Sequence, residues 1–126
     1  MGKPEYIDLT PEMRERLERF REQHEGEPLG KIATRMLFED ERVRIWELRL
    51  EPGEATDLHR HDYDYYLTIL RGDRVAAVHP KESGRENYVA KVPPGGHTAR
   101  LRKGGMEWAV NVGDEPYHEI LIELVG

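Results

Sequence analysis

The sequence of 126 residues contains no cysteine. A disulfide framework, a thiolate metal site and a cysteine nucleophile are therefore excluded, and this composition is typical of a cytoplasmic protein. Long apolar runs are also missing, and no apolar stretch follows the charged residue near the N-terminus. We therefore expect a soluble chain with neither a membrane span nor a leader peptide.

Basic residues are fewer than acidic ones: the sequence has 19 Lys and Arg, 25 Asp and Glu, and a formal net charge of −6. Nucleic acids and anionic membrane surfaces both favour a clustered positive field. Here the Lys and Arg residues are scattered among acidic ones, so we expect neither partner. The length predicts one domain with a single core.

Residues 1–30 are predicted to form a helical extension. Thr10 can cap a helix that begins at Pro11, where a missing N–H does no harm. Apolar residues then recur at helical spacing. They predict a packing face made of Met13, Leu17 and Phe20.

From residue 31 to the C-terminus, short alternating segments separated by turns replace the helical period. Gly and Pro at points such as Pro52-Gly53 mark the turns. About eight short strands at regular spacing favour an all-β fold, either a double-sheet jelly roll or a small barrel. The expected strands cover residues 32–38, 43–50, 65–70, 75–78, 88–92, 98–101, 107–112 and 120–124.

The stretch from residue 52 to residue 72 carries the side chains with the most chemistry. In an extended strand, alternate side chains share one face. One face is then expected to carry His59, His61, Tyr63 and Tyr65. Imidazoles and phenols in register do not make a hydrophobic core, so we interpret this face as the wall of a polar binding site.

This stretch resembles the first motif of the cupin family, in which a glycine turn leads to His-x-His, then a glutamate, then a second glycine. Gly53, His59, His61 and Gly72 match the pattern. Tyr65 stands where the family has its glutamate.

The second cupin motif is traceable with variations. It runs from Gly96 to Asn111, and Glu107 stands where the family has a histidine. The resemblance covers about residue 43 to the C-terminus. It implies a double-stranded β-helix, the cupin jelly-roll barrel, over residues 31–126.

In cupins that follow the usual pattern, three histidines and a glutamate hold one divalent metal. The resemblance implies His59, His61 and Glu107 as the ligands here, and two imidazoles with one carboxylate suit Fe, Mn, Ni or Zn. Tyr65 would then be a rare phenolate ligand, or a hydrogen-bond donor or proton carrier beside the metal. The implied activity is that of a metal-dependent oxygenase, isomerase or lyase acting on a small polar metabolite.

Two other functions stay open. Without a metal, one histidine, His61 or His59, flanked by Tyr63, Tyr65 and Glu107 could pass protons, as in a dehydratase, an isomerase or a lyase. A non-catalytic cupin could bind a small molecule in the same place, and the fold alone does not choose between these activities. The resemblance also implies a homodimer, because a second subunit commonly covers the edge strands of a single barrel.

The other histidines are interpreted as lying outside the site. His24 and His79 are expected at the surface, and His118 is expected to pack at a strand end. His97 follows a Pro and Gly turn, but the spacing to the asparagine of the second motif selects Glu107 instead.

Overall fold

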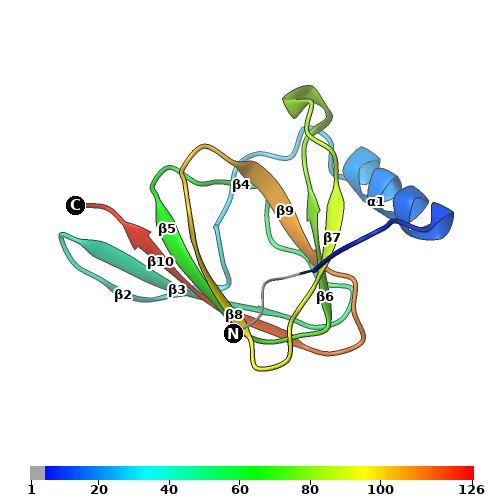
Figure 1. The fold of residues 1–126 in the computed structure, drawn as a ribbon. Coiled ribbons are helices and arrows are strands. Elements are labelled where there is room, and N and C mark those ends of the chain that lie inside the picture. The colour runs from blue at the N-terminus through cyan, green and yellow to red at the C-terminus, as the bar shows by residue number, and fades with distance from the viewer. Residues whose placement is uncertain (1–4) are drawn as a thin grey trace.

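The computed structural model describes residues 5–126, and most of its elements are strands (Figure 1). The predicted all-β fold with one N-terminal α-helix is confirmed. The elements are β1 (Glu5–Ile7), α1 (Pro11–Gln23), β2 (Arg35–Glu39), β3 (Val43–Leu50), β4 (His59–Arg60), β5 (Tyr65–Arg71), β6 (Arg74–Val78), the 3-10 helix η1 (Lys81–Ser83), β7 (Tyr88–Lys91), β8 (His97–Leu101), β9 (Met106–Asn111) and β10 (Tyr117–Leu124).

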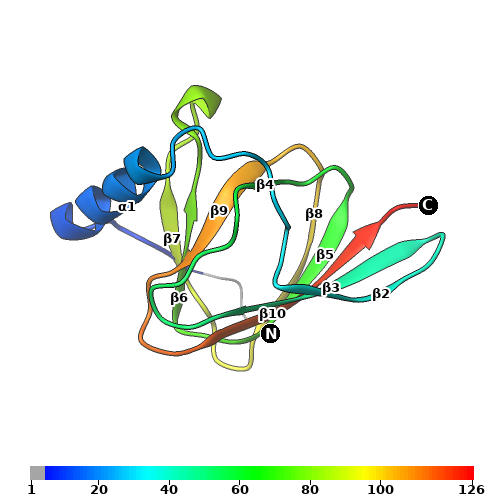
Figure 2. The ribbon, with the colours of Figure 1, turned by 180° about the vertical axis from the view of Figure 1, so that it is seen from behind.

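The strands form two five-stranded antiparallel sheets that face each other (Figures 1 and 2). One sheet has the order β1-β7-β6-β9-β4, and the other has the order β2-β3-β10-β5-β8. Each predicted strand overlaps an observed one. Strand β1 is not predicted, because a strand of three residues is too short to show an alternating pattern, and the extended strand expected through His59 and Tyr65 is divided into β4 and β5.

Helix α1 covers the outer face of the first sheet (Figure 2). The hydroxyl oxygen of Thr10 accepts a hydrogen bond from the Met13 amide at 3.1 Å, and Pro11 occupies the first turn, as predicted. Leu17 is 1% exposed and packs in a cluster with side chains of β6, β7 and β9 that include Trp108. The apolar stripe of the helix is therefore its packing face.

The N-terminal extension also contributes to the barrel. Strand β1 pairs with β7, with Tyr6 opposite Ala90. The division of the chain at residue 30 remains a prediction. Within residues 5–126, no helix has both the length and the apolar character needed to cross a bilayer.

In β9 and in β10, one face of the strand is turned toward the barrel interior and the other face is turned away from it. In β9, Trp108 packs under the helix, whereas Glu107 faces the space between the sheets. In β10 the buried residues are Tyr117, Glu119, Leu121 and Glu123, so this strand turns its polar set inward. Its isoleucines lie on the opposite face.

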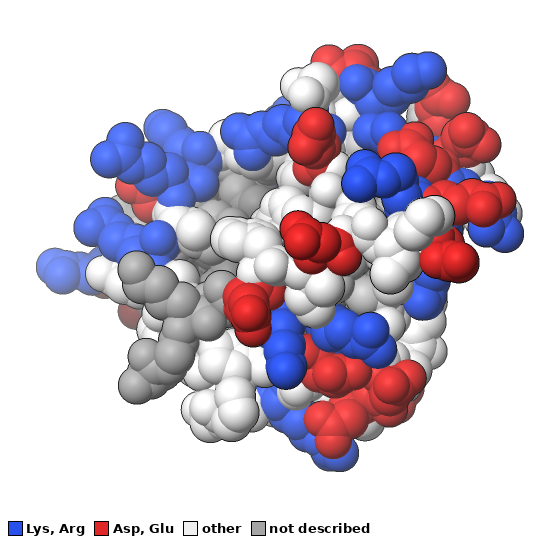
Figure 3. Space-filling view, turned by 45° about the vertical axis from the view of Figure 1, so that its right-hand side comes forward, with Lys and Arg blue, Asp and Glu red and all other residues white. Residues whose placement is uncertain are grey.

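Charged side chains of both signs are interspersed on the α1 side of the molecule (Figure 3). This agrees with the scattered charges of the sequence.

Candidate functional site

The two histidines of the first motif lie side by side. Strand β4 ends at Arg60 and β5 begins at Tyr65, so irregular backbone separates the two strands. His59 and His61 are nonetheless buried, at 3% and 4% exposed, and their ring centroids are 5.0 Å apart.

Tyr65 joins this pair, but Tyr63 does not. The ring of Tyr65 stacks on that of His61, with centroids 4.1 Å apart and an interplanar angle of 12°. Tyr63 is half-buried, and the guanidinium of Arg44 on β3 lies over its ring, 5.4 Å from the centroid. The predicted alternation fails at Tyr63 because the chain leaves the extended conformation after β4.

Both imidazoles are held in the neutral form. Burial lowers the pKa of His59, against an opposing effect of the Asp57 carbonyl oxygen, which lies 2.9 Å from its Nδ1. Burial, followed by the neighbouring His59, lowers the pKa of His61 to about 4. The Nδ1 atom of His61 is buried without a hydrogen-bond partner among the residues that the structure describes.

Glu107 lies directly opposite His59 in the register of β9 and β4. Burial raises the pKa of Glu107 to about 7, and Arg85 opposes this shift. The carboxyl group therefore exchanges protons close to neutral pH, although ordinary glutamates titrate well below it.

The three predicted metal ligands, His59, His61 and Glu107, are thus neighbours, and neutral imidazoles with a carboxylate are chemically suited to a divalent metal. However, no three or more His, Cys, Asp or Glu side chains within residues 5–126 are arranged to hold a metal ion. As these side chains lie, they do not form a three-ligand site. The metal and its ligands remain a prediction.

Glu107 also lines a cavity of about 500 Å³ between the two sheets. Most of the wall is apolar and comes from side chains such as Leu67, Ile69 and Val75. A volume of this size suits a small organic molecule. His59, His61 and Tyr65 lie outside this lining, so Glu107 links the histidine pair to the cavity.

A second carboxyl group, that of Glu119 on β10, lines the same cavity. The Tyr117 hydroxyl donates a hydrogen bond to its Oε1 at 2.7 Å. Burial raises the pKa of Glu119 to about 7; the bond from Tyr117 lowers it, and the negative charge of Glu107 raises it further. Glu119 is not predicted from the sequence, because the more apolar residues that alternate with it suggest the opposite face as the buried one.

Two tyrosines from neighbouring strands also line the cavity. Tyr6 on β1 and Tyr88 on β7 meet edge to face, with centroids 5.2 Å apart and an interplanar angle of 81°. Burial, followed by the negative charge of Glu107, raises the pKa of Tyr88 to about 12. The Tyr88 phenol is therefore protonated at neutral pH.

Comparison with known proteins identifies the fold. No family model and no curated protein matches the sequence. A cupin domain from Bordetella pertussis Tohama I has a TM-score of 0.63 at 24% identity, covering 76% of this chain and 94% of that one. A double-stranded beta-helix protein from Klebsiella pneumoniae has a TM-score of 0.57 at 15% identity, covering 84% and 87%. This chain has the cupin fold.

A third match is oxalate decarboxylase from Bacillus subtilis, a protein described as having Mn(II) centres. Its TM-score is 0.51 at 18% identity, and the match covers 67% of this chain but only 22% of that chain. The predicted double-stranded β-helix is confirmed by these structures. Identities this low show the fold and leave the activity open.

Two histidines of this chain lie where they were not expected from the sequence. His97 lines the barrel cavity. His79 is 4% exposed rather than at the surface, because the segment after η1 folds back over it. Its amide donates to Asn87 Oδ1 at 2.8 Å, and its Nδ1 lies 3.0 Å from the Glu86 carbonyl oxygen.

The remaining two histidines make other contacts. His24 is half-buried and stacks on Phe20, with centroids 4.1 Å apart. His118 lies near the start of β10, and its Nε2 is 2.9 Å from Glu47 Oε2 on β3. Its principal contact is therefore polar rather than the expected packing.

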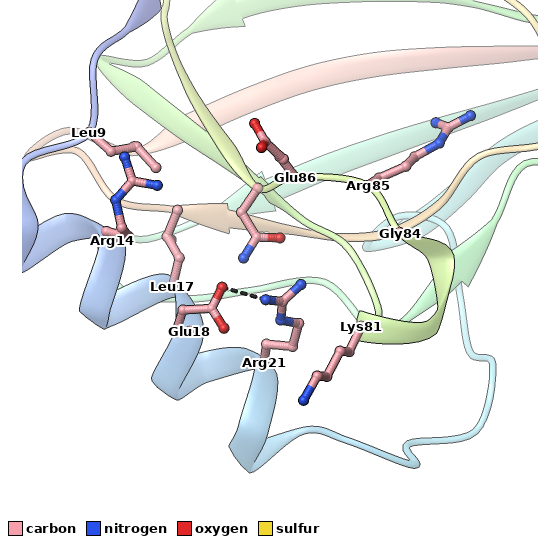
Figure 4. Close-up of a pocket in the computed structure, with 10 residues that line it drawn as sticks. Leu9, Arg14, Leu17, Glu18, Arg21, Lys81, Gly84, Arg85 and Glu86 are labelled. Carbon is pink, nitrogen blue, oxygen red and sulfur yellow. Dashed lines mark hydrogen bonds and ion pairs between the residues drawn. The ribbon is translucent and has the colours of Figure 1, made fainter.

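A second cavity of about 330 Å³ lies outside the cupin barrel, between α1 and the segment around η1 (Figure 4). Arg21 in its wall is paired with Glu18. Arg85 points away from this cavity (Figure 4). A Cβ atom added to Gly105 would lie 3.9 Å from Arg85 Nη1 and 4.0 Å from His61 Cδ2, so Arg85 reaches toward the histidine pair of the barrel.

Proposed function

We propose that this cupin is an enzyme that transfers protons on a small molecule held in the barrel cavity, as a dehydratase or an isomerase does. The observation that carries the proposal is that two carboxyl groups, those of Glu107 and Glu119, line one largely apolar cavity. Neither forms an ion pair within residues 5–126. Glu107 is half-buried in the cavity wall, Glu119 accepts one hydrogen bond, from the Tyr117 hydroxyl, and no basic side chain among the described residues neutralises either carboxyl group.

The two groups suit acid–base chemistry at neutral pH. A carboxyl group with a pKa of about 7 can both accept and donate a proton there. The charge of Glu107 raises the pKa of Glu119, so ionisation of one group favours the protonated form of the other. The ionised group removes a proton from a substrate carbon, and the neutral group donates one to a neighbouring oxygen or carbon.

This proposal moves the proton-carrying role from His61 to Glu107. The low pKa of His61 keeps its imidazole neutral and makes it a weak base at pH 7. Tyr65, stacked on His61, keeps its proton because burial raises its pKa, and it supplies a hydrogen-bond donor near Glu107. Tyr63, which contacts Arg44, has no role in the proposed step.

Deuterium exchange tests the proposal. Small carbonyl and hydroxy compounds are incubated with the protein in D₂O, and loss of C–H signals is followed by NMR. We expect Glu107→Gln and Glu119→Gln each to slow exchange by about 10²-fold or more. Glu123→Gln is the matched control, because Glu123 is buried on the same face of β10, accepts a hydrogen bond from Trp46 and does not line the cavity. Equal exchange in all three variants would contradict the proposal.

A second candidate is the predicted metal-dependent enzyme with His59, His61 and Glu107 as ligands. The unpartnered buried Nδ1 of His61 and the closeness of the three side chains favour it. The Mn(II) centres of the structurally similar oxalate decarboxylase lend it further support. Elemental analysis of untagged protein separates the candidates: near one equivalent of Fe, Mn, Ni or Zn, lost in Glu107→Ala, would favour the metal enzyme.

We propose a homodimer and a cytoplasmic location for this cupin. The edge strand β2 exposes apolar side chains, among them Phe38 at 52%, and a second subunit would cover them. The absence of cysteine supports a reducing compartment.

A further inference from the structure

One corner of the barrel cavity combines aromatic rings with a carboxyl group: Tyr6, Tyr88 and Glu107 all line it. The two rings meet edge to face, and Tyr88 lies close enough to Glu107 for the carboxylate to act on its phenol. Tyr6 is 70% exposed and Tyr88 39%, so both rings are accessible from outside. The rest of the lining is mainly aliphatic.

This combination has a chemical preference. Aromatic faces attract cations through the ring quadrupole, and the attraction strengthens where water is excluded. A carboxylate without a partner in an apolar cavity gains most from a ligand that brings a positive charge. An anionic ligand would face both Glu107 and Glu119 and would raise the cost of ionising either.

The lysine that lines the cavity does not neutralise this corner. Lys91 forms no ion pair with Glu107 or Glu119 within residues 5–126. Arg85 acts on Glu107 from the exposed segment before β7, and burial outweighs its effect.

We infer that the ligand of the cavity is a small organic cation, with an ammonium group on an apolar body, whose charge lies against Glu107 beside the rings of Tyr6 and Tyr88. The inference names the substrate class of the proposed function at the same site. Only the designation of the cation as a substrate rests on that function. Binding of the cation requires the geometry of the cavity alone.

Calorimetric titration with three probes of one shape tests the inference: benzylamine, benzyl alcohol and benzoate at pH 7.5. They carry a positive charge, no charge and a negative charge on the same apolar ring. We expect benzylamine to bind the wild-type protein roughly tenfold more tightly than benzyl alcohol, and benzoate to bind more weakly than either. Tighter binding of benzoate than of benzylamine, or binding of no probe, would overturn the inference.

Three variants identify the groups responsible. Glu107→Gln should reduce the preference for benzylamine over benzyl alcohol to about twofold or less, because the carboxylate is gone. Tyr88→Leu should weaken benzylamine binding several-fold, whereas Tyr88→Phe should retain it, because the ring and not the hydroxyl attracts the cation. A preference that survives Glu107→Gln unchanged would place the cation elsewhere and refute the assignment.

The binding experiment and the exchange experiment can each contradict one proposal without contradicting the other. A benzylamine preference that Glu107→Gln removes, combined with no deuterium exchange for any amine, would keep the inference and reject the proton-transfer function. Exchange that is fastest with uncharged or anionic compounds would keep the function and reject the substrate class.

Discussion

At the scale of single residues, Glu119 is the side chain whose position is most informative. It lies 7% exposed inside the barrel with one hydrogen-bond donor, the Tyr117 hydroxyl. Its neighbours within the cavity are Glu107, which raises its pKa, and the protonated phenol of Tyr117. Such a carboxyl group destabilises the folded state whenever it is ionised.

The consequence for stability is a pH dependence of known sign. The pKa of Glu119 rises from 4.5 to about 7 on folding, so the folded state holds the proton more tightly than the unfolded state. The free energy of unfolding that this residue contributes is therefore lost as the pH rises from about 4.5 through 7. We expect Glu119→Gln, which can still accept the Tyr117 hydrogen bond, to unfold in urea with a free energy on the order of 2–3 kcal/mol above wild type at pH 8 and with little difference at pH 4.5.

The control is Glu25→Gln, a change at an exposed residue after α1, which should follow wild type at both values of pH. If Glu119→Gln were less stable than wild type at pH 8, Glu119 would be a favourable ionised group and the description of the cavity would be wrong.

Single residues also show which parts of the site could be predicted from the sequence and which could not. His59, His61, Tyr65 and Glu107 are predicted from motif spacing, and the structure brings all four together. Tyr63 follows the same alternation but contacts Arg44, because two strands and a bend replace the single strand assumed. Glu119 carries no motif. Its burial depends on which face of β10 meets the opposite sheet, and a long-range pairing of that kind cannot be read from a local pattern.

At the scale of elements, the turn between β7 and β8 determines how β8 lies along the cavity. Gly95 and Gly96 both have left-handed backbone, with φ of +84° and +86°. They differ in their surroundings: a Cβ atom on Gly95 would meet nothing within 4 Å, whereas one on Gly96 would lie 2.2 Å from the Ile69 carbonyl oxygen. That oxygen belongs to β5, which pairs with β8.

The two positions make a matched pair of alanine substitutions. Gly95→Ala should cost about 1 kcal/mol of unfolding free energy, which is the usual penalty for a left-handed non-glycine residue. Gly96→Ala should cost at least about 2 kcal/mol more, because β8 must move away from β5. Urea unfolding measures both, and equal losses would show that β8 does not pack against β5 as closely as the structure has it.

Most of the elements themselves are predictable from the sequence. The cap at Thr10, the stripe that includes Leu17 and the alternation in the longer strands each follow from local chemistry, and the structure has all of them. The short strand β1 is not predictable, since its conformation comes from pairing with β7, and neither is the early end of β4 at Arg60.

At the scale of the whole molecule, the exposed apolar side chains of β2 predict self-association. Strand β2 is an edge of its sheet, and Met36, Leu37 and Phe38 are 38%, 42% and 52% exposed. Unprotected edges of this kind pair with other chains. Light scattering after size exclusion should give about twice the chain mass of 14.7 kDa.

A charged side chain on the edge strand β2 should prevent self-association. We expect Phe38→Lys to elute as a monomer, and Leu29→Lys, at a 47% exposed residue outside the sheets, to remain a dimer. A monomeric wild-type protein would contradict the proposed homodimer without affecting the barrel cavity.

In the proposed function, Glu107 and Glu119 form an acid–base pair poised near neutral pH inside the barrel. NMR titration of the side-chain carboxyl carbons in protein labelled with ¹³C at glutamate tests it most directly, with Glu107→Gln and Glu119→Gln to assign the signals. The account predicts two carboxyl signals that titrate with apparent pKa values close to 7, and a change in the remaining one when either partner is replaced. Titration of every glutamate below about pH 5 would contradict it.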